Sequence, residues 1–170
     1  MCGIVGFCAL EDLVGPSVIE AAMSAIRHRG PDDEGYIAYD LGTGGVTEYL
    51  GTDSLARNGV HISSGKEERR CVVFGHRRLS IIDPTVAGHQ PMSYKDRRYW
   101  IIYNGEVYNY IEIRQALQKR GYSFSTKTDT EVILASYMEW GPDCLDRFNG
   151  MWIFGISVIH YCSPTSFVLS

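Results

Sequence analysis

The fold is decided by the stretch Y-W-I-I-Y-N-G-E-V-Y-N, which occupies Tyr99–Asn109. Its first part, Tyr99–Tyr103, is a short apolar and aromatic run of the kind that forms a buried β-strand. The Asn104-Gly105 pair after it is a common type I′ hairpin turn. Only three residues separate this pair from Asn109, the predicted N-cap of a helix, and they are too few for a good return strand. We therefore expect Asn104-Gly105 at the end of a central strand that leads into a helix.

Strands and helices alternate irregularly on both sides of this stretch. The other predicted strands are Gly3–Ala9, Gly35–Asp40, Val46–Leu50, Cys71–Phe74, Leu79–Ile82 and Met151–Ile159. The predicted helices begin at a capping box of Ser17 and Glu20, at Asn109, and at a capping box of Thr128 and Glu131. A doubly wound sheet would need one helix between successive strands, and that spacing is missing. The pattern favours an α+β fold built in layers.

Composition excludes several classes of protein. The chain has 170 residues, of which 45% are hydrophobic and 21% charged, so one globular domain with a real core is expected. The net charge of −4 offers no basic face, so we expect no nucleic acid as a partner. The longest apolar stretch, Met151–Ile159, is too short to span a membrane, so no membrane partner is expected.

The N-terminus and the cysteines indicate a cytoplasmic protein. The first residues lack a basic leader, and two acidic residues follow at Glu11 and Asp12, which is unlike a signal peptide. The five cysteines are scattered and form no C-x-x-C pair. With no paired metal-ligand spacing among cysteines and histidines, we expect free thiols and no metal site.

Cys2 is the first residue with a chemical interpretation beyond packing. Methionine aminopeptidases remove Met1 when the second residue is small, which would leave a thiol and a free α-amine on one residue. An α-amine has a pKa of about 7.7–8.0 and can act as the base for its own side chain. On position alone the simpler reading is a small buried residue, because cysteine is among the most buried residue types.

Three other segments combine charge or amide groups with apolar surroundings. Arg77 and Arg78 lie between two predicted strands, where an arginine is usually solvated but can also clamp a carboxylate with its planar fork. An asparagine beside a glycine N–H, as at Asn104-Gly105, can form an oxyanion hole. A carboxylate at the start of the helix after Thr128 would be held rigidly enough to bind an ammonium group.

Six motifs in order carry a resemblance to a known family. They are M-C-G-I-V-G (1–6), H-R-G-P-D-D-E-G (28–35), G-H-R-R-L-S-I-I-D (75–83), Q-P-M (90–92), Y-N-G-E-V-Y-N (103–109) and T-D-T-E (128–131). Over Cys2–Gly155 their order and spacing resemble the glutaminase half of glutamine-hydrolysing asparagine synthetases, which are class II glutamine amidotransferases. The resemblance implies a four-layer αββα sandwich of the N-terminal nucleophile hydrolase type.

The resemblance also assigns roles to residues. It implies that Cys2 is the nucleophile that forms a γ-glutamyl thioester, with its own α-amine as the base. Arg78 would bind the α-carboxylate of L-glutamine, and Glu106 and Asp129 would bind its α-ammonium group. Asn104 and the Gly105 N–H would form the oxyanion hole. His28, Arg29 and the Gly30-Pro31 turn would support this geometry, while Arg77 is left as structural or solvated.

The resemblance ends near Gly155, and the domain boundaries follow from this. We expect a partial glutamine amidotransferase type 2 domain over residues 2–156, a divergent tail over 157–170, and no synthetase domain in this chain. ATP and magnesium would be needed only by that missing domain, its expected partner, and the glutaminase step would need no cofactor. The sandwich would be incomplete at its C-terminus, with a sheet edge unpaired and Trp152, Phe154 and Ile156 poorly covered.

Three functions remain open from the sequence. The first is a glutaminase that supplies ammonia for ATP-dependent asparagine synthesis. The second is another class II amidotransferase, which feeds ammonia to a sugar-phosphate or phosphoribosyl acceptor. The third is a non-catalytic remnant that binds glutamine. The wording of the motifs around Arg78 and Asn104 favours the first.

Overall fold

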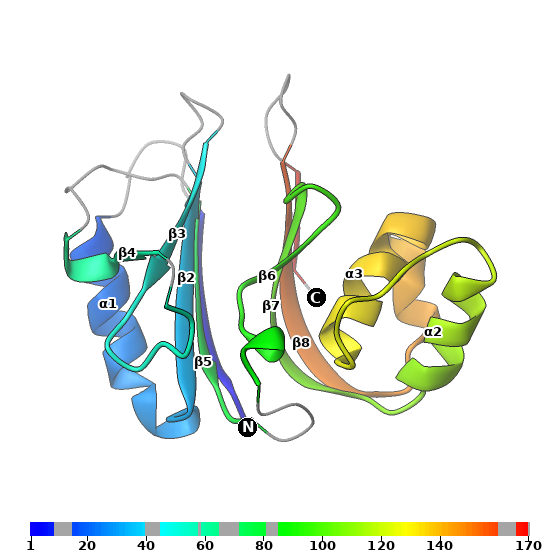
Figure 1. Cartoon of the computed structure of the whole chain (residues 1–170), viewed down its shortest axis with the longest axis horizontal. Coiled ribbons are helices and arrows are strands. Elements are labelled where there is room, and N and C mark those ends of the chain that lie inside the picture. Colours follow the sequence, from blue (N-terminus) through cyan, green and yellow to red (C-terminus); the bar gives the residue numbers. More distant parts are fainter. Residues whose placement is uncertain are drawn as a thin grey trace.

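Two stacked β-sheets with helices on their outer faces form the molecule (Figure 1). The structure is a computed structural model that describes residues 1–8, 15–39, 45–57, 59–64, 72–80, 85–159 and 166–169. Its strands are β1 (Gly3–Cys8), β2 (Asp33–Tyr39), β3 (Val46–Leu50), β4 (Val60–His61), β5 (Val72–Arg78), β6 (Met92–Tyr94), β7 (Tyr99–Val107), β8 (Gly150–Val158) and β9 (Ser166–Leu169). Its α-helices are α1 (Pro16–Ala25), α2 (Tyr110–Gln118) and α3 (Asp129–Trp140). This arrangement confirms the predicted α+β class.

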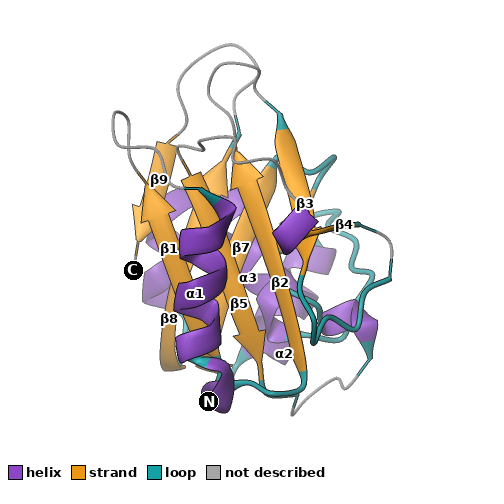
Figure 2. Cartoon of the chain, turned by 90° about the vertical axis from the view of Figure 1, so that its left-hand side faces the viewer, coloured by secondary structure: helices purple, strands orange, loops and turns teal. Residues whose placement is uncertain are grey.

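The first sheet has the order β1-β5-β2-β3-β4, and α1 lies across its outer face (Figure 2). Antiparallel pairing joins β1, β5, β2 and β3, so the N-terminal strand is an edge strand beside β5. Helix α1 buries Ile19 and Met23 against Tyr36 and Val73 of the sheet. One face of α1 therefore packs against the outer face of the first sheet and stabilises it.

The second sheet has the order β6-β7-β8-β9, and α2 and α3 cover its outer face (Figure 1). Leu117 of α2 and Ile133 of α3 pack there against Ile101 of β7 and Phe154 of β8. The inner faces of the two sheets share another cluster, in which Trp100 and Ile102 of β7 contact residues of β2 and β5. Because the first part of β7, Tyr99–Tyr103, packs on both faces, its sequence is a continuous apolar run rather than an alternating one. The layers confirm the αββα sandwich.

The helix starts are partly as predicted. Thr128 caps α3, and its hydroxyl accepts a hydrogen bond from the Glu131 N–H at 3.4 Å. The capping box predicted for Ser17 is wrong, because Gly15 is the N-cap of α1 and Pro16 begins the helix. Proline suits this first position, since its missing N–H would have no partner within the helix.

Two strands are longer than predicted. β5 continues to Arg78, so Arg77 and Arg78 lie within a strand rather than between two strands. β7 continues to Val107, so Asn104 and Gly105 lie inside it, opposite Ile153 and Trp152 of β8. The segment predicted as a strand over Leu79–Ile82 is not one at residues 79 and 80, and its remainder lies outside the described residues.

The C-terminal segment corrects the expectation of exposed apolar surface. β9 pairs with β8 over Gly155–Val158, so this part of β8 has a partner on both sides. Phe154 and Ile156 are buried, and Trp152 is half-buried between the rings of Phe148 and Phe154. The expected poor cover is therefore wrong for Phe154 and Ile156, while Met151 and Ile153, earlier in the same strand, are exposed. None of the described helices is both long and apolar enough to cross a membrane.

Candidate active site

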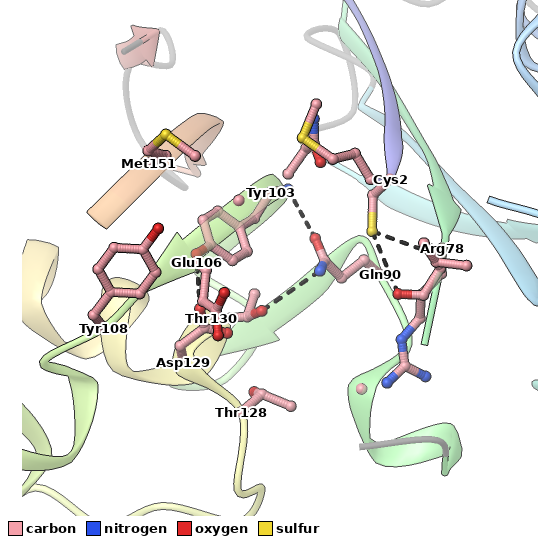
Figure 3. Close-up of a pocket in the computed structure, with 15 residues that line it drawn as sticks. Cys2, Arg78, Gln90, Tyr103, Glu106, Tyr108, Thr128, Asp129, Thr130 and Met151 are labelled. Atoms are coloured by element: carbon pink, nitrogen blue, oxygen red, sulfur yellow. Dashed lines mark hydrogen bonds between the residues drawn. The ribbon is translucent and has the colours of Figure 1, made fainter. Parts of the chain in front are cut away.

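One cavity of about 280 Å³ collects the residues that the sequence singled out. It lies at the end of the molecule where the N-terminus sits between the two sheets (Figure 1). All six predicted site residues line it: Cys2, Arg78, Asn104, Gly105, Glu106 and Asp129. They come from four segments of the chain, so the fold alone brings them together. Figure 3 shows Cys2 and Arg78 on one side of the cavity and Glu106 and Asp129 across from them.

Cys2 is held at the start of β1 by contacts to its side chain and its backbone. Gly3 pairs with Arg77 of β5, so Cys2 lies beside Arg78. The Cys2 Sγ accepts a hydrogen bond from the Leu79 N–H at 3.4 Å, and the Leu79 carbonyl oxygen is 3.7 Å away. Arg29 Nε donates to the Cys2 carbonyl oxygen at 3.3 Å, in keeping with the supporting role expected for Arg29. These contacts direct a free thiol into the cavity.

Arg78 supplies a buried cation to the cavity. It is the last residue of β5, and only 6% of its surface is exposed. Its Nη1 donates to the Thr85 carbonyl oxygen at 2.8 Å. A Cβ at Gly88 would lie 1.9 Å from Nη2, so the absence of a side chain there gives the guanidinium its room. A guanidinium fixed in this way can bind a carboxylate in bidentate fashion.

Arg77, its neighbour, has a different task because successive strand residues point to opposite faces. Its guanidinium is 2.7 Å from Glu34 Oε2 and 2.6 Å from Asp53 Oδ2. With 4% of its surface exposed, Arg77 is a buried structural residue. Of the two interpretations left open for Arg77, the structural one is confirmed and the solvated one is wrong.

Gly105 allows β7 and β8 to approach closely at the cavity. Its φ is 156°, and a Cβ there would lie 2.4 Å from the Met151 carbonyl oxygen. Any other residue would have to push the β8 backbone away. Asn104 and Glu106, on either side of Gly105, point to the same face of the strand, which is the cavity face. An amide side chain, a backbone N–H and a carboxylate thus follow one another along this wall.

Asp129 is a buried carboxyl group at the first position of α3. Its Oδ2 accepts hydrogen bonds from the Tyr103 hydroxyl at 2.7 Å and the Val107 N–H at 3.2 Å. Burial raises the pKa of Asp129, and these hydrogen bonds oppose the rise because they stabilise the ionised form. A carboxylate is also favoured at a helix N-terminus. The group is therefore fixed at the cavity wall by α3 and by contacts to β7 of the second sheet.

The sequence did not identify Tyr103, Gln90 and His76 as site residues. Tyr103 and Gln90 line the cavity, and the Gln90 side-chain oxygen accepts a hydrogen bond from the Tyr103 N–H at 2.8 Å. The His76 ring is wholly buried between the sheets and contacts the Tyr103 carbonyl oxygen. All three lie within the six motifs, but their spacing along the chain does not predict that they contact one another. Among the described residues, no three His, Cys, Asp or Glu side chains gather as a metal site.

Comparison with known proteins gives a consistent result. A model of the glutamine amidotransferase domain family matches residues 51–160. Asparagine synthetase [glutamine-hydrolyzing] 1 of Bacillus subtilis is 39% identical over 91% of this chain and 20% of its own length. A putative asparagine synthetase [glutamine-hydrolyzing] 2 of Methanocaldococcus jannaschii is 35% identical over 92% of this chain and 27% of its own length. The chain thus spans about a quarter or less of these relatives.

A solved structure supports the fold independently of close sequence similarity. The glutamine phosphoribosylpyrophosphate amidotransferase of B. subtilis superposes with a TM-score of 0.72 and 17% identity. The match covers 100% of this chain and 37% of that one, so both sheets and their helices lie within it. The family match, the relatives and the shared fold lead to one conclusion: this chain belongs to the glutamine amidotransferase domain family.

Proposed function

We propose that this domain hydrolyses L-glutamine to glutamate and ammonia through a thioester on Cys2. One observation carries the proposal: a single cavity places a thiol, a buried cation and two carboxylates around a space of about 280 Å³. A free amino acid carries one negative and one positive group next to each other, and such a site complements both. A glutamine side chain within a protein would offer neither charge.

The charged residues set the orientation of the substrate. Arg78 binds the α-carboxylate, since its guanidinium is held in place by the Thr85 carbonyl oxygen. Asp129 and Glu106 bind the α-ammonium group from the other side of the cavity. The carboxamide end of glutamine then reaches Cys2. The contacts to the α-carboxylate and the α-ammonium group thus keep the carboxamide carbon close to the sulfur of Cys2, in position to react.

The reaction begins once Met1 has been removed, because the nitrogen of Cys2 is then a free amine rather than an amide. This amine takes the thiol proton as Sγ bonds to the carboxamide carbon, whose oxygen becomes an oxyanion. The Asn104 side chain and the Gly105 N–H donate hydrogen bonds to that oxyanion. As the C–N bond breaks, the proton passes to the leaving nitrogen and ammonia departs. Water then hydrolyses the thioester, releasing glutamate and the thiol.

The ammonia is proposed to serve ATP-dependent asparagine synthesis by a synthetase domain, the partner implied by the names of the two relatives described above. ATP and magnesium would belong to that partner, and the glutaminase step needs no cofactor. The solved amidotransferase named for a phosphoribosyl acceptor shares only the fold, at 17% identity, so it favours no second acceptor. The free thiols of Cys2 and Cys144 suit a reducing cytoplasm, where we place the protein.

Ammonia release from L-glutamine by the purified chain tests the proposal. Cys2→Ala should abolish it, and Cys2→Ser should nearly do so because a hydroxyl is the weaker nucleophile. Cys144→Ala is the control, since burial raises the pKa of that thiol to about 11 and it lies away from the cavity. Mass spectrometry should show that Met1 is missing. Full activity in Cys2→Ala, or in a chain with an uncleaved N-terminal tag, would contradict the mechanism.

A further inference from the structure

Tyr103 stands out because each of its polar groups is engaged by a buried side chain. Its N–H donates to Gln90 Oε1 at 2.8 Å, and its carbonyl oxygen lies 2.9 Å from His76 Nε2. Its hydroxyl donates to Asp129 Oδ2 at 2.7 Å. The residue thus connects the first sheet, the segment before β6 and the start of α3.

The backbone contacts of Tyr103 compensate for the end of a neighbouring strand. β6 pairs with β7 only as far as Met92 opposite Ile101, so that edge of β7 lacks a ladder partner at Tyr103. A residue in an antiparallel ladder directs its N–H and its C=O to the same neighbour. Here the side chains of Gln90 and His76 take the place of that neighbour. Both are buried, so the backbone of Tyr103 is held from two directions.

His76 acts as a hydrogen-bond donor to the carbonyl oxygen of Tyr103. Burial lowers its pKa to about 4, so the ring is neutral at physiological pH and carries one N–H. A carbonyl oxygen can only accept a hydrogen bond, so the proton must be on Nε2. Nδ1 is then an acceptor, and it has no hydrogen-bond partner among the described residues. The tautomer of His76 is therefore fixed by Tyr103.

The hydroxyl of Tyr103 acts in turn on Asp129. Burial and the nearby carboxylate raise the pKa of Tyr103, so the phenol stays protonated and is a permanent donor. The Val107 N–H donates to the same Oδ2 atom, so two hydrogen bonds hold this oxygen of the carboxylate. A charged acceptor strengthens such hydrogen bonds. The orientation of Asp129 therefore depends on the position of the Tyr103 ring.

We propose that Tyr103 is the positioning residue of the ammonium subsite: it holds the Asp129 carboxylate ready for the α-ammonium group of the substrate, while Gln90 and His76 hold Tyr103. The proposal rests on the proposed function in that it takes glutamine as the ligand. It does not require that the bound glutamine be hydrolysed.

The test removes one oxygen atom. In the full chain carrying Cys2→Ala, which prevents turnover, Tyr103→Phe should weaken L-glutamine binding about tenfold in isothermal titration calorimetry, the scale of one hydrogen bond to a charged group. The ring stays in the core, so packing is kept. Tyr94→Phe is the matched control: Tyr94 is also buried in the second sheet, and its hydroxyl donates to the Ser123 carbonyl oxygen at 2.9 Å. It should leave glutamine affinity unchanged.

A second readout separates positioning from stability. Tyr103→Phe removes a donor that lowers the pKa of Asp129, so the loss of glutamine affinity at acidic pH should begin at a higher pH than in the unaltered site. With the Cys2 thiol present, KM should rise about tenfold while kcat changes by about twofold or less. Tyr94→Phe should move neither quantity.

Each outcome decides the matter. Unchanged affinity and pH profile in Tyr103→Phe would overturn the proposal and leave Tyr103 as a core residue, and so would an equal loss of affinity in Tyr94→Phe. If the Cys2→Ala chain binds no glutamine, this proposal and the proposed function fail together. If it binds glutamine but the unaltered chain releases no ammonia, only the hydrolysis is refuted, and the comparison between the two tyrosine variants still stands.

Discussion

Replacing Arg77 by methionine would test the distinction between the two adjacent arginines. Methionine approximates the stem of arginine but removes a charge that lies 2.7 Å from Glu34 and 2.6 Å from Asp53. Glu34 is 2% exposed and, among the described residues, would keep the Tyr36 hydroxyl and the Asp53 N–H as partners for its carboxylate. Removing one member of a buried ion pair costs about 3–5 kcal/mol, because the other charge is left without compensation.

That cost converts into a large thermal shift. For a chain of this size each kcal/mol lowers Tm by about 2–4 °C, so Arg77→Met should lower it by about 6–20 °C. Circular dichroism or differential scanning calorimetry of the purified chain would measure the change. The double variant Arg77→Met with Glu34→Gln removes the stranded charge and should recover part of the loss. A fall of less than about 2 °C in Arg77→Met would refute the account of Arg77 as a buried structural cation.

Three further predictions concern the cavity and its support. Arg78→Lys should raise KM for glutamine about tenfold in the ammonia assay with little change in kcat, because lysine lacks the planar fork that grips a carboxylate. Gly105→Ala should both lower Tm and abolish ammonia release, since the added Cβ would lie 2.4 Å from the Met151 carbonyl oxygen. As the pH falls from about 6.5 to about 4, His76 binds a proton in the unfolded chain but stays neutral in the folded one, because burial lowers its pKa to about 4. The free energy of unfolding, measured by urea titration, should therefore fall by about 3 kcal/mol over this range. His76→Gln, which keeps a donor for the Tyr103 carbonyl oxygen, should flatten that slope.

The sequence was informative wherever a short segment determines its own structure. The apolar run at Tyr99–Tyr103 is a strand, and Thr128 caps a helix, because period and capping are local properties. The resemblance to a family assigned Cys2, Arg78 and Asp129 to one site, and in the structure all three line the same cavity. Their common location depends on no single segment, and only the set of motifs in order indicated it.

The sequence was uninformative wherever strand ends and stacking decide the result. The sequence did not show that Arg77 and Arg78 point to opposite faces of one strand, because that strand was predicted to end at Phe74. Ser17 looked like a helix cap, but Pro16 beside it is the first helical residue, so the cap is Gly15, two residues earlier. The contact between His76 and Tyr103 joins two different sheets, and no pattern along the chain encodes which strands face each other across that layer.

The cavity draws its walls from both sheets, and this has a consequence for the whole sandwich. Cys2 precedes β1 and Arg78 ends β5 of the first sheet, while Glu106 belongs to β7 and Asp129 to α3 on the other side. A glutamine whose α-carboxylate is held by Arg78 and whose α-ammonium group is held by Asp129 would act as a clasp between the two layers, which also meet through apolar side chains such as Trp100 and Phe74 and through the contact between His76 and Tyr103. Substrate would then slow amide hydrogen exchange along the inner strands far from the cavity, because separating the layers would first require its release.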